Sequence, residues 1–199
     1  KAVIRKGAIT EALADVVRGG KLRRLAIQQG YVTIAQRAAI AKRVGHRRLK
    51  DVNDKLIDQR AVKDAGEVRL IERALAIQQE AFRSTLKFIK PGRTESQIAA
   101  YLEYQMRSLG ADGTSFPSIV AADANASLPH AVPGSAKVKR GGVVLIDWGA
   151  RYRGYCSDLT RVIAVGRMPA KIREIYTVVL DAQLAAIGAG GVLRDITHT

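Results

Sequence analysis

One pattern in the second half of the chain constrains its fold more than any other. The apolar run Val143-Val144-Leu145-Ile146 is closed by Asp147, which predicts a buried strand that ends in a carboxylate. A second β-rich run, 155–163, follows Tyr152-Arg153-Gly154 and carries Asp158. The spacing therefore predicts a β-hairpin with one aspartate on each strand.

The register of this hairpin decides whether the two carboxylates meet. A two-residue loop at Tyr152-Arg153 places Asp147 directly opposite Asp158, and such cross-strand neighbours have Cβ atoms roughly 4.5–5.5 Å apart. A three-residue loop ending in Gly154 shifts the pairing by one residue and places the two side chains on opposite faces. Two neighbouring carboxylates repel unless a proton or a cation lies between them. The first register therefore predicts a divalent-metal site.

Two neighbouring residues bear on such a site. Thr160 follows Asp158 by two positions on the same strand face, where its hydroxyl can orient a metal-binding carboxylate. His130 lies in a proline-bounded loop at 128–133; by itself, a histidine in this setting is more often an ordinary loop residue. Carboxylate oxygens with imidazole suit Mn²⁺, Zn²⁺, Co²⁺ or Fe²⁺, and the sequence does not choose among these metals.

The rest of the chain is predicted to form helices and a small α/β region. Ahead of the β-rich segment 114–166, the apolar spacing predicts a long helix from about Asp64 to Ile89 and a second helix that begins after Thr94, which forms a capping box with Gln97. Helix returns from about Ala170. The earlier elements expected are a strand at 24–27, a helix at 34–44 capped by Thr33, and strand and turn over 49–57.

A domain boundary is expected near Arg60, so that 1–60 and 61–199 belong to different domains of an α+β protein. Most of the net charge of +15 lies in residues 1–93, while 94–199 is nearly balanced. The densest basic run, 42–50, can contact phosphates. It contains no aromatic residue to stack a base, and it equally suits a solvated helix end followed by a loop. We favour the second interpretation, and nucleic acid is not an expected partner.

Composition excludes several protein classes. Apolar residues make up 47% of the chain, which is ample for a buried core and unlike a disordered chain. The single cysteine, Cys156, cannot form an internal disulfide and favours a reducing, cytoplasmic setting. No apolar run approaches the ~20 residues that a membrane span needs, so no membrane partner is expected.

The residues around the aspartates resemble a known family. The motif is Asp147-Trp148-Gly149-Ala150, then Gly154-Tyr155-Cys156-Ser157-Asp158-Leu159-Thr160-Arg161, with Pro129-His130 ahead of both. It is similar to the Xaa-Pro aminopeptidase and prolidase branch of the pita-bread metallopeptidases, also called the creatinase/methionine aminopeptidase-like enzymes. One departure is Val162, where a threonine often follows the Thr-Arg pair. The resemblance covers nearly the whole chain but only part of a full-length member.

The resemblance implies a dinuclear metal site. It implies that Asp147 binds one metal through both oxygens, that Asp158 bridges two metals, and that His130 contacts the substrate or the tetrahedral intermediate. Two divalent ions, with Mn²⁺ the first choice, then activate a bridging water that hydrolyses the bond N-terminal to proline. The implied partners are a peptide with proline at its second position and a second copy of the chain, as a homodimer.

The same resemblance implies the fold, and it also implies that some of the family's metal ligands are missing from this sequence. Residues 61–199 are expected to form the first half of a pita-bread domain, and 1–60 the end of the small α/β domain that precedes it. The family completes its metal site with a histidine and two glutamates well after the second aspartate. After Asp158 this sequence holds only Glu174 and His198 of those types, in other contexts. We therefore expect a segment of a longer protein that is inactive alone.

Two alternatives remain open at the level of sequence. The first is a pita-bread fold that has lost catalysis and binds nucleic acid or a protein, which the basic first part suits. The second is a non-metal relative such as a creatine-cleaving enzyme, which the intact Asp147 and Asp158 pair disfavours.

Overall fold

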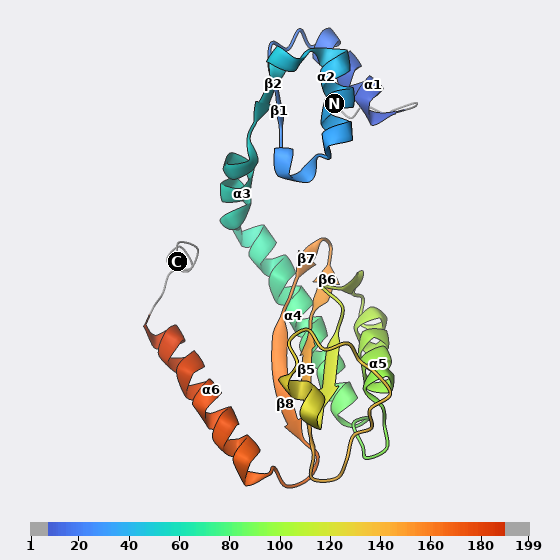
Figure 1. Ribbon diagram of the computed structural model, residues 1–199, viewed down its shortest axis with the longest axis vertical. Helices are drawn as coiled ribbons and strands as arrows, with labels where there is room; N and C mark the ends of the chain where they lie inside the picture. Colours follow the sequence, from blue (N-terminus) through green and yellow to red (C-terminus); the bar gives the residue numbers. More distant parts are fainter. Residues whose placement is uncertain (1–7, 190–199) are drawn as a thin grey trace. The chain divides into compact units, whose positions relative to one another are not determined.

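The chain folds into two compact units in a computed structural model that describes residues 8–189, with backbone only at Gln29, Asn53 and Asp54 (Figure 1). The division falls between Asp64 and Ala65, close to the boundary expected near Arg60. Each unit has its own cluster of buried apolar side chains.

The first unit is a small α/β unit. Its elements are α1 (Ile9–Gly19), β1 (Leu25–Ile27), the 3₁₀ turn η1 (Gln29–Tyr31), α2 (Ile34–Val44), the 3₁₀ turn η2 (His46–Arg48), β2 (Leu49–Asp51) and α3 (Asn53–Ala61). Strands β1 and β2 pair in parallel. The core of this unit is formed by Ala14, Val17, Ile27, Ile40, Ala41, Val44 and Leu49.

The expected strand and helix of this unit are confirmed. Thr33 Oγ1 accepts from Gln36 N at 3.2 Å, and Gln36 Oε1 accepts from Thr33 N at 2.9 Å, which completes a capping box. The helix ends at Val44, and Gly45 follows it with φ 92°. The basic run therefore does include a helix end, but it continues through the turn η2 into the start of β2 and not through a loop alone. The expectation of strand and turn over 49–57 is wrong beyond Asp51, because α3 begins at Asn53.

The second unit combines helices with two small sheets. Its elements are α4 (Ala65–Leu86), α5 (Glu95–Ser108), β3 (Gly113–Thr114), β4 (Ile119–Ala122), the 3₁₀ turn η3 (Asp123–Ser127), β5 (Val143–Trp148), β6 (Ala150–Tyr152), β7 (Tyr155–Cys156), β8 (Leu159–Ala164) and α6 (Ala170–Gly188). The strands form two antiparallel sheets, in the orders β4-β5-β8 and β3-β6-β7. The two long helices expected after Asp64 and Thr94 are confirmed, although α4 ends three residues before Ile89.

Alternation along β5 separates the core from the site. Val144, Ile146 and Trp148 are fully buried and belong to the same core cluster as Ile77 of α4 and Leu102 of α5. Leu145 and Asp147 lie on the opposite face of the strand, where they are only half-buried. The helices therefore cover one face of the β4-β5-β8 sheet and leave the Asp147 side chain on the other.

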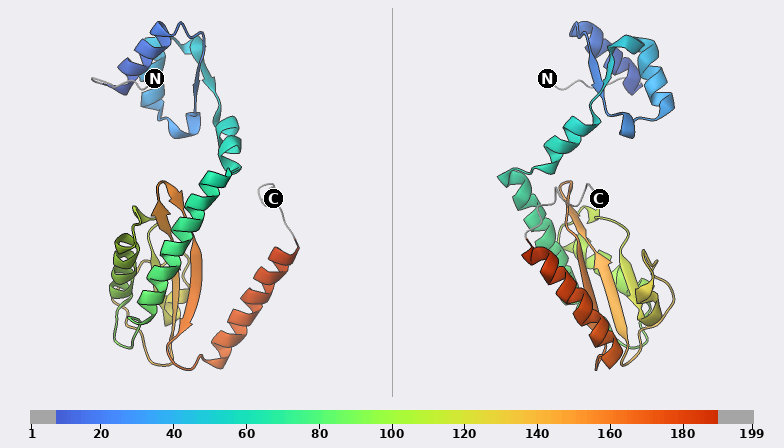
Figure 2. Two further views of the ribbon diagram at one scale, coloured as in Figure 1. Left: turned by 180° about the vertical axis from the view of Figure 1, so that it is seen from behind. Right: turned by 60° about the vertical axis from the view of Figure 1, so that its left-hand side comes forward.

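The last described helix, α6, is drawn in red after β8 in Figure 2. It confirms the helix expected from about Ala170, and none of its residues is buried. Its exposed apolar side chains include Ile175, Val178 and Ile187. Among residues 8–189, no helix combines the length and the apolar character that crossing a membrane requires.

Candidate metal centre

The turn that joins β6 to β7 sets the hairpin register. Its two central residues are Arg153 and Gly154, with φ of 49° and 84°, and Tyr152 pairs with Tyr155 on either side. A type I′ turn requires positive φ at both central positions, and glycine satisfies that requirement without strain. The predicted loop at Tyr152-Arg153 is therefore wrong by one position, and the three-residue alternative is also wrong.

This turn moves the partner of Asp147. Asp147 lies opposite Thr160 instead of Asp158, so the direct pairing of the two aspartates is corrected to a diagonal one. The shift equals two residues along the partner strand, and side-chain direction repeats every two residues. Both carboxylates therefore remain on one face, although the expected register is wrong.

Asp147 interacts with both of the other polar side chains. Thr160 Oγ1 donates to Asp147 Oδ1 at 3.0 Å, as expected of a hydroxyl that orients a carboxylate. The carboxyl group of Asp158 lies within hydrogen-bonding reach of that of Asp147. Asp147 is half-buried, while Asp158 and Thr160 are exposed. Asp147 and Asp158 thus lie on one open side of the sheet, and the Thr160 hydroxyl orients the more buried of the two, Asp147.

This proximity raises the pKa of Asp158 above its ordinary value of 3.8. The largest cause is the partial removal of its carboxyl group from water; the negative charge of Asp147 and a hydrogen bond with the Asp147 carboxyl follow. A divalent cation between the two groups would replace the repulsion by attraction. Oxygen-rich donor sets of this kind bind divalent metals, so the pair fits part of a metal site.

The raised pKa predicts an effect of Asp158→Asn on the metal-free protein. The folded state binds the Asp158 proton more tightly than the unfolded chain, so wild-type stability falls as pH rises through and above 3.8. Asp158→Asn removes this penalty and is expected to raise the free energy of unfolding at pH 7 by less than about 1 kcal/mol, because the group is exposed. The gain should vanish at pH values below 3.8.

Urea unfolding midpoints of both proteins across this pH range measure the effect. Asp181→Asn, at an exposed position on α6, is the matched control. A gain that is the same at every pH, or that appears equally in the control, contradicts the electrostatic explanation.

The point where the hairpin passes from one sheet to the other depends on Gly149. A Cβ at this position would lie 1.9 Å from the backbone oxygen of Ser157 and 2.7 Å from Ser115 Oγ. Ser115 Oγ donates to that same Ser157 oxygen at 2.8 Å, and Ala150 N donates to Ser157 Oγ at 3.1 Å. Close strand contact at Gly149 therefore places Ser157 and, next to it, Asp158. No pattern in the sequence by itself indicates this role of Gly149.

His130 takes a different position from the aspartates in the fold. It lies in the turn after η3, is exposed, and has the left-handed φ of 54°. Within the described part of the chain, no group of three or more His, Cys, Asp or Glu side chains could hold a metal ion, so His130 does not complete a ligand set with Asp147 and Asp158. Glu174 lies on α6 and pairs with Lys171. His198 lies outside the described residues.

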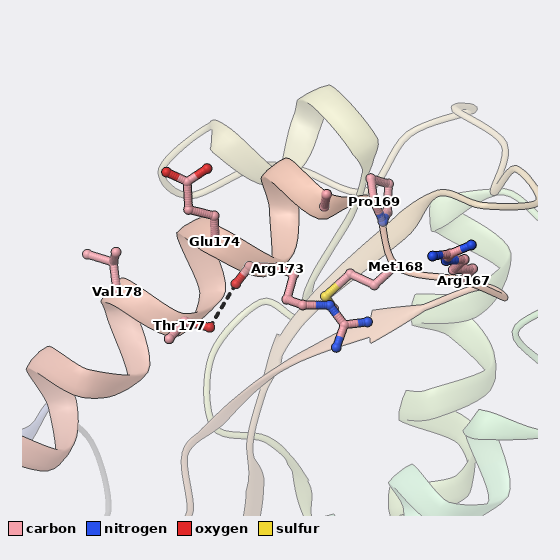
Figure 3. Close-up of a pocket in the computed structure, with 8 residues that line it drawn as sticks. Arg167, Met168, Pro169, Arg173, Glu174, Thr177 and Val178 are labelled. Atoms are coloured by element: carbon pink, nitrogen blue, oxygen red, sulfur yellow. Dashed lines mark hydrogen bonds between the residues drawn. The ribbon is translucent and has the colours of Figure 1, made fainter.

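A hollow among the described residues lies away from the aspartates. It has a volume of about 740 Å³ and lies along the start of α6 (Figure 3). Its lining residues are Arg167, Met168, Pro169, Ala170, Arg173, Glu174, Thr177 and Val178. These residues do not include the aspartates, and most are exposed. The carboxylate pair, whose donor chemistry is specific, is therefore the stronger functional site.

Comparisons with known proteins show what the chain is similar to. Residues 69–192 match metallopeptidase family M24. Over 191 residues the chain is 38% identical to the uncharacterised peptidase YqhT of Bacillus subtilis; the aligned region covers 96% of this chain and 54% of the relative. Over 140 residues it is 39% identical to an Xaa-Pro dipeptidase of Pyrococcus furiosus; the aligned region covers 70% of this chain and 40% of that relative. The chain thus spans about half the length of the curated relatives it matches.

The fold agrees as well. The X-Pro aminopeptidase from Thermotoga maritima superimposes with a TM-score of 0.83 and 36% identity, covering 90% of this chain and 51% of that one. The pita-bread architecture expected from the motif is confirmed, again over roughly half of the solved structure. The match over residues 69–192 shows that the chain belongs to metallopeptidase family M24.

Proposed function

We propose that the complete protein is a metal-dependent peptidase that hydrolyses the bond N-terminal to proline in Xaa-Pro peptides. The observation that carries the proposal is the pair of contacting carboxylates, Asp147 and Asp158, on one open face of the hairpin. Relatives named Xaa-Pro dipeptidase and X-Pro aminopeptidase support the choice of substrate. The runner-up, a binding module without catalysis, has no comparable observation in its favour.

Each site residue has a role in this proposal. Asp147 and Asp158 would hold two divalent ions, with Mn²⁺ the first choice. Thr160 keeps Asp147 oriented through its hydroxyl. Such ions, when bound, supply an activated water and polarise the scissile carbonyl. His130 donates a hydrogen bond to the negative charge that develops on the carbonyl oxygen.

Three further points belong to the proposal. Two carboxylates provide too few ligands for a dinuclear centre, so we propose that these 199 residues are inactive alone. Residues 1–60 are proposed to be the end of a basic α/β domain ahead of the catalytic one. The complete protein is proposed to act in the cytoplasm as a homodimer.

Peptide hydrolysis by the complete protein tests the proposal. The purified protein is stripped with a chelator and reloaded with Mn²⁺, Co²⁺, Zn²⁺ or Fe²⁺, and Xaa-Pro dipeptides and longer Xaa-Pro peptides are assayed against matched Xaa-Ala peptides. We expect proline-dependent cleavage that the chelator abolishes. Absence of cleavage with every metal overturns the proposal. Salt-sensitive binding of nucleic acid in the same inactive protein would then favour the binding module.

The Thr160 hydroxyl gives a separate prediction about metal affinity. Thr160→Val keeps the side-chain shape but removes the donor to Asp147 Oδ1. Loss of a group that orients a metal ligand typically weakens metal binding by about 10–100-fold, and we expect a loss in this range by calorimetric titration of Mn²⁺. Thr177→Val, which removes a hydroxyl that donates to Arg173 O within α6, is the control. Equal Mn²⁺ affinity in both variants contradicts the role given to Thr160.

A further inference from the structure

A buried carboxylate outside the metal centre lies at the start of α5. Glu95 is the first residue of this helix and is 1% exposed. The capping box at the helix start is completed by Thr94 and Gln97 without it. Acidic residues are common in the first turn of a helix, where they face solvent and their negative charge interacts favourably with the helix dipole. Glu95 instead turns inward, so its side chain has another role.

The Glu95 carboxylate accepts three hydrogen bonds from one loop. Its Oε1 accepts from Ala122 N at 2.7 Å and from Asn125 Nδ2 at 2.9 Å. Its Oε2 accepts from Gly134 N at 2.9 Å. Ala122 ends β4, Asn125 lies in η3, and Gly134 lies well beyond both. One side chain therefore ties together the two ends of the segment 122–134.

The neighbouring residue strengthens one end of this tie. Ser96 Oγ lies 2.9 Å from both Pro133 O and Gly134 O, to which it donates. Ser96 N also donates to Gly134 O, and Glu95 N donates to Ala136 O, each at 3.0 Å. Backbone and side-chain hydrogen bonds from the start of α5 thus hold the C-terminal end of the loop.

The segment closed in this way contains His130. Its backbone has φ 54°, a left-handed conformation that non-glycine residues adopt at a cost in free energy. Such a conformation persists only where the surrounding structure determines it. His130 itself is exposed, so its own side chain has little packing to hold it. The hydrogen bonds at the two ends of the loop therefore help to fix its backbone.

We propose that Glu95 is a positioning residue for catalysis: by tying both ends of segment 122–134, its carboxylate fixes the loop that presents His130 to the substrate. This inference rests on the proposed peptidase function and on the role of His130 in it. Glu95 contacts no reacting atom and acts only through the loop.

The chemistry of the tie makes Glu95→Gln the decisive variant. Glutamine has the same shape but replaces one acceptor oxygen with an N–H₂ donor. If the donor takes the place of Oε1, it faces Ala122 N–H; if it takes the place of Oε2, it faces Gly134 N–H. A backbone N–H cannot reverse its polarity, so one end of the loop loses its partner in either orientation. Glu103→Gln, later in the same helix, is the matched control.

Two measurements on the complete, metal-loaded protein test the inference. Hydrogen exchange reports the loop directly, and we expect Glu95→Gln to speed exchange of the Ala122 or Gly134 amide by about tenfold or more. Kinetics report positioning: Glu95→Gln and His130→Ala are each expected to lower kcat/KM by about tenfold to a hundredfold, and the double variant to lower it no further than His130→Ala alone. Mn²⁺ affinity should stay at the wild-type value, because the aspartates lie on the hairpin.

The outcomes separate the possible failures. Additive losses in the double variant overturn the inference, because Glu95 then acts independently of His130. Unchanged exchange in segment 122–134 overturns it as well. If the wild type cleaves no peptide, the proposed function fails, and exchange alone still shows whether Glu95 holds the loop. If Glu95→Gln does not fold, Asn125→Ala removes one of the three donors at a half-buried position and undergoes the same tests.

Discussion

Replacing either aspartate of the complete protein by asparagine is expected to lower kcat/KM for an Xaa-Pro peptide by about a thousandfold or more. Each substitution removes a negative charge and a metal-binding oxygen while it keeps the side-chain shape. Bound metals stabilise the transition state by several kcal/mol, and each 1.36 kcal/mol corresponds to a factor of ten in rate. Asp147 is half-buried and supported by Thr160. Within the described residues, no third His, Cys, Asp or Glu side chain joins Asp147 and Asp158 in a metal-binding group, so none can replace a lost ligand.

Steady-state kinetics and the metal content of the purified variants measure this effect. Asp181→Asn on α6 controls for a general Asp-to-Asn change at an exposed position. The comparison with stability is informative, because Asp158→Asn is expected to make the metal-free protein slightly more stable and the loaded protein inactive. Stability and function then change in opposite directions at one residue, as expected where repulsion is retained for function. A variant that keeps its full metal content and its activity would contradict the metal-ligand role.

Gly149→Ala is expected to lower the free energy of unfolding by about 2–4 kcal/mol. The added Cβ would lie 1.9 Å from Ser157 O, a backbone atom that cannot move without moving the strand. Ser157 also accepts and donates hydrogen bonds with Ser115 and Ala150 across this contact. Relief of the clash must push the Ser157 segment away from Gly149. The neighbouring Asp158 would move with it, so metal affinity should fall together with stability.

Urea unfolding and Mn²⁺ titration of the complete protein measure these two effects. Gly188→Ala is the matched control, since a Cβ there meets nothing within 4 Å. It lies at the end of α6, where replacing glycine by alanine costs nothing sterically. If Gly149→Ala unfolds at the same urea concentration as the wild type, the close strand contact is not required.

Local patterns predicted the elements that depend on local physics. The helix after Thr94 begins where its capping box places it, because the box is made by residues three positions apart. The strand that ends in Asp147 is where its apolar run places it. The sequence left open whether Asp147 and Asp158 share a face, because side-chain direction depends on whether the register is odd or even; the observed register keeps them on one face. Helix α1, by contrast, was not anticipated, and α3 replaced an expected strand and turn.

What the tertiary structure decided depends on contacts between distant residues. Two-residue loops one position apart are both compatible with the hairpin sequence, and the structure selected the one with Gly154 in the left-handed position. Gly149 looks like any strand-end glycine until Ser157 is brought against it. Glu95 looks like an ordinary first-turn acid until Ala122 and Gly134 fold onto it. The sequence alone thus determined the types of the candidate ligands and the family resemblance. Only the tertiary structure placed the hairpin register and the buried carboxylate, because both depend on which distant backbone atoms come into contact.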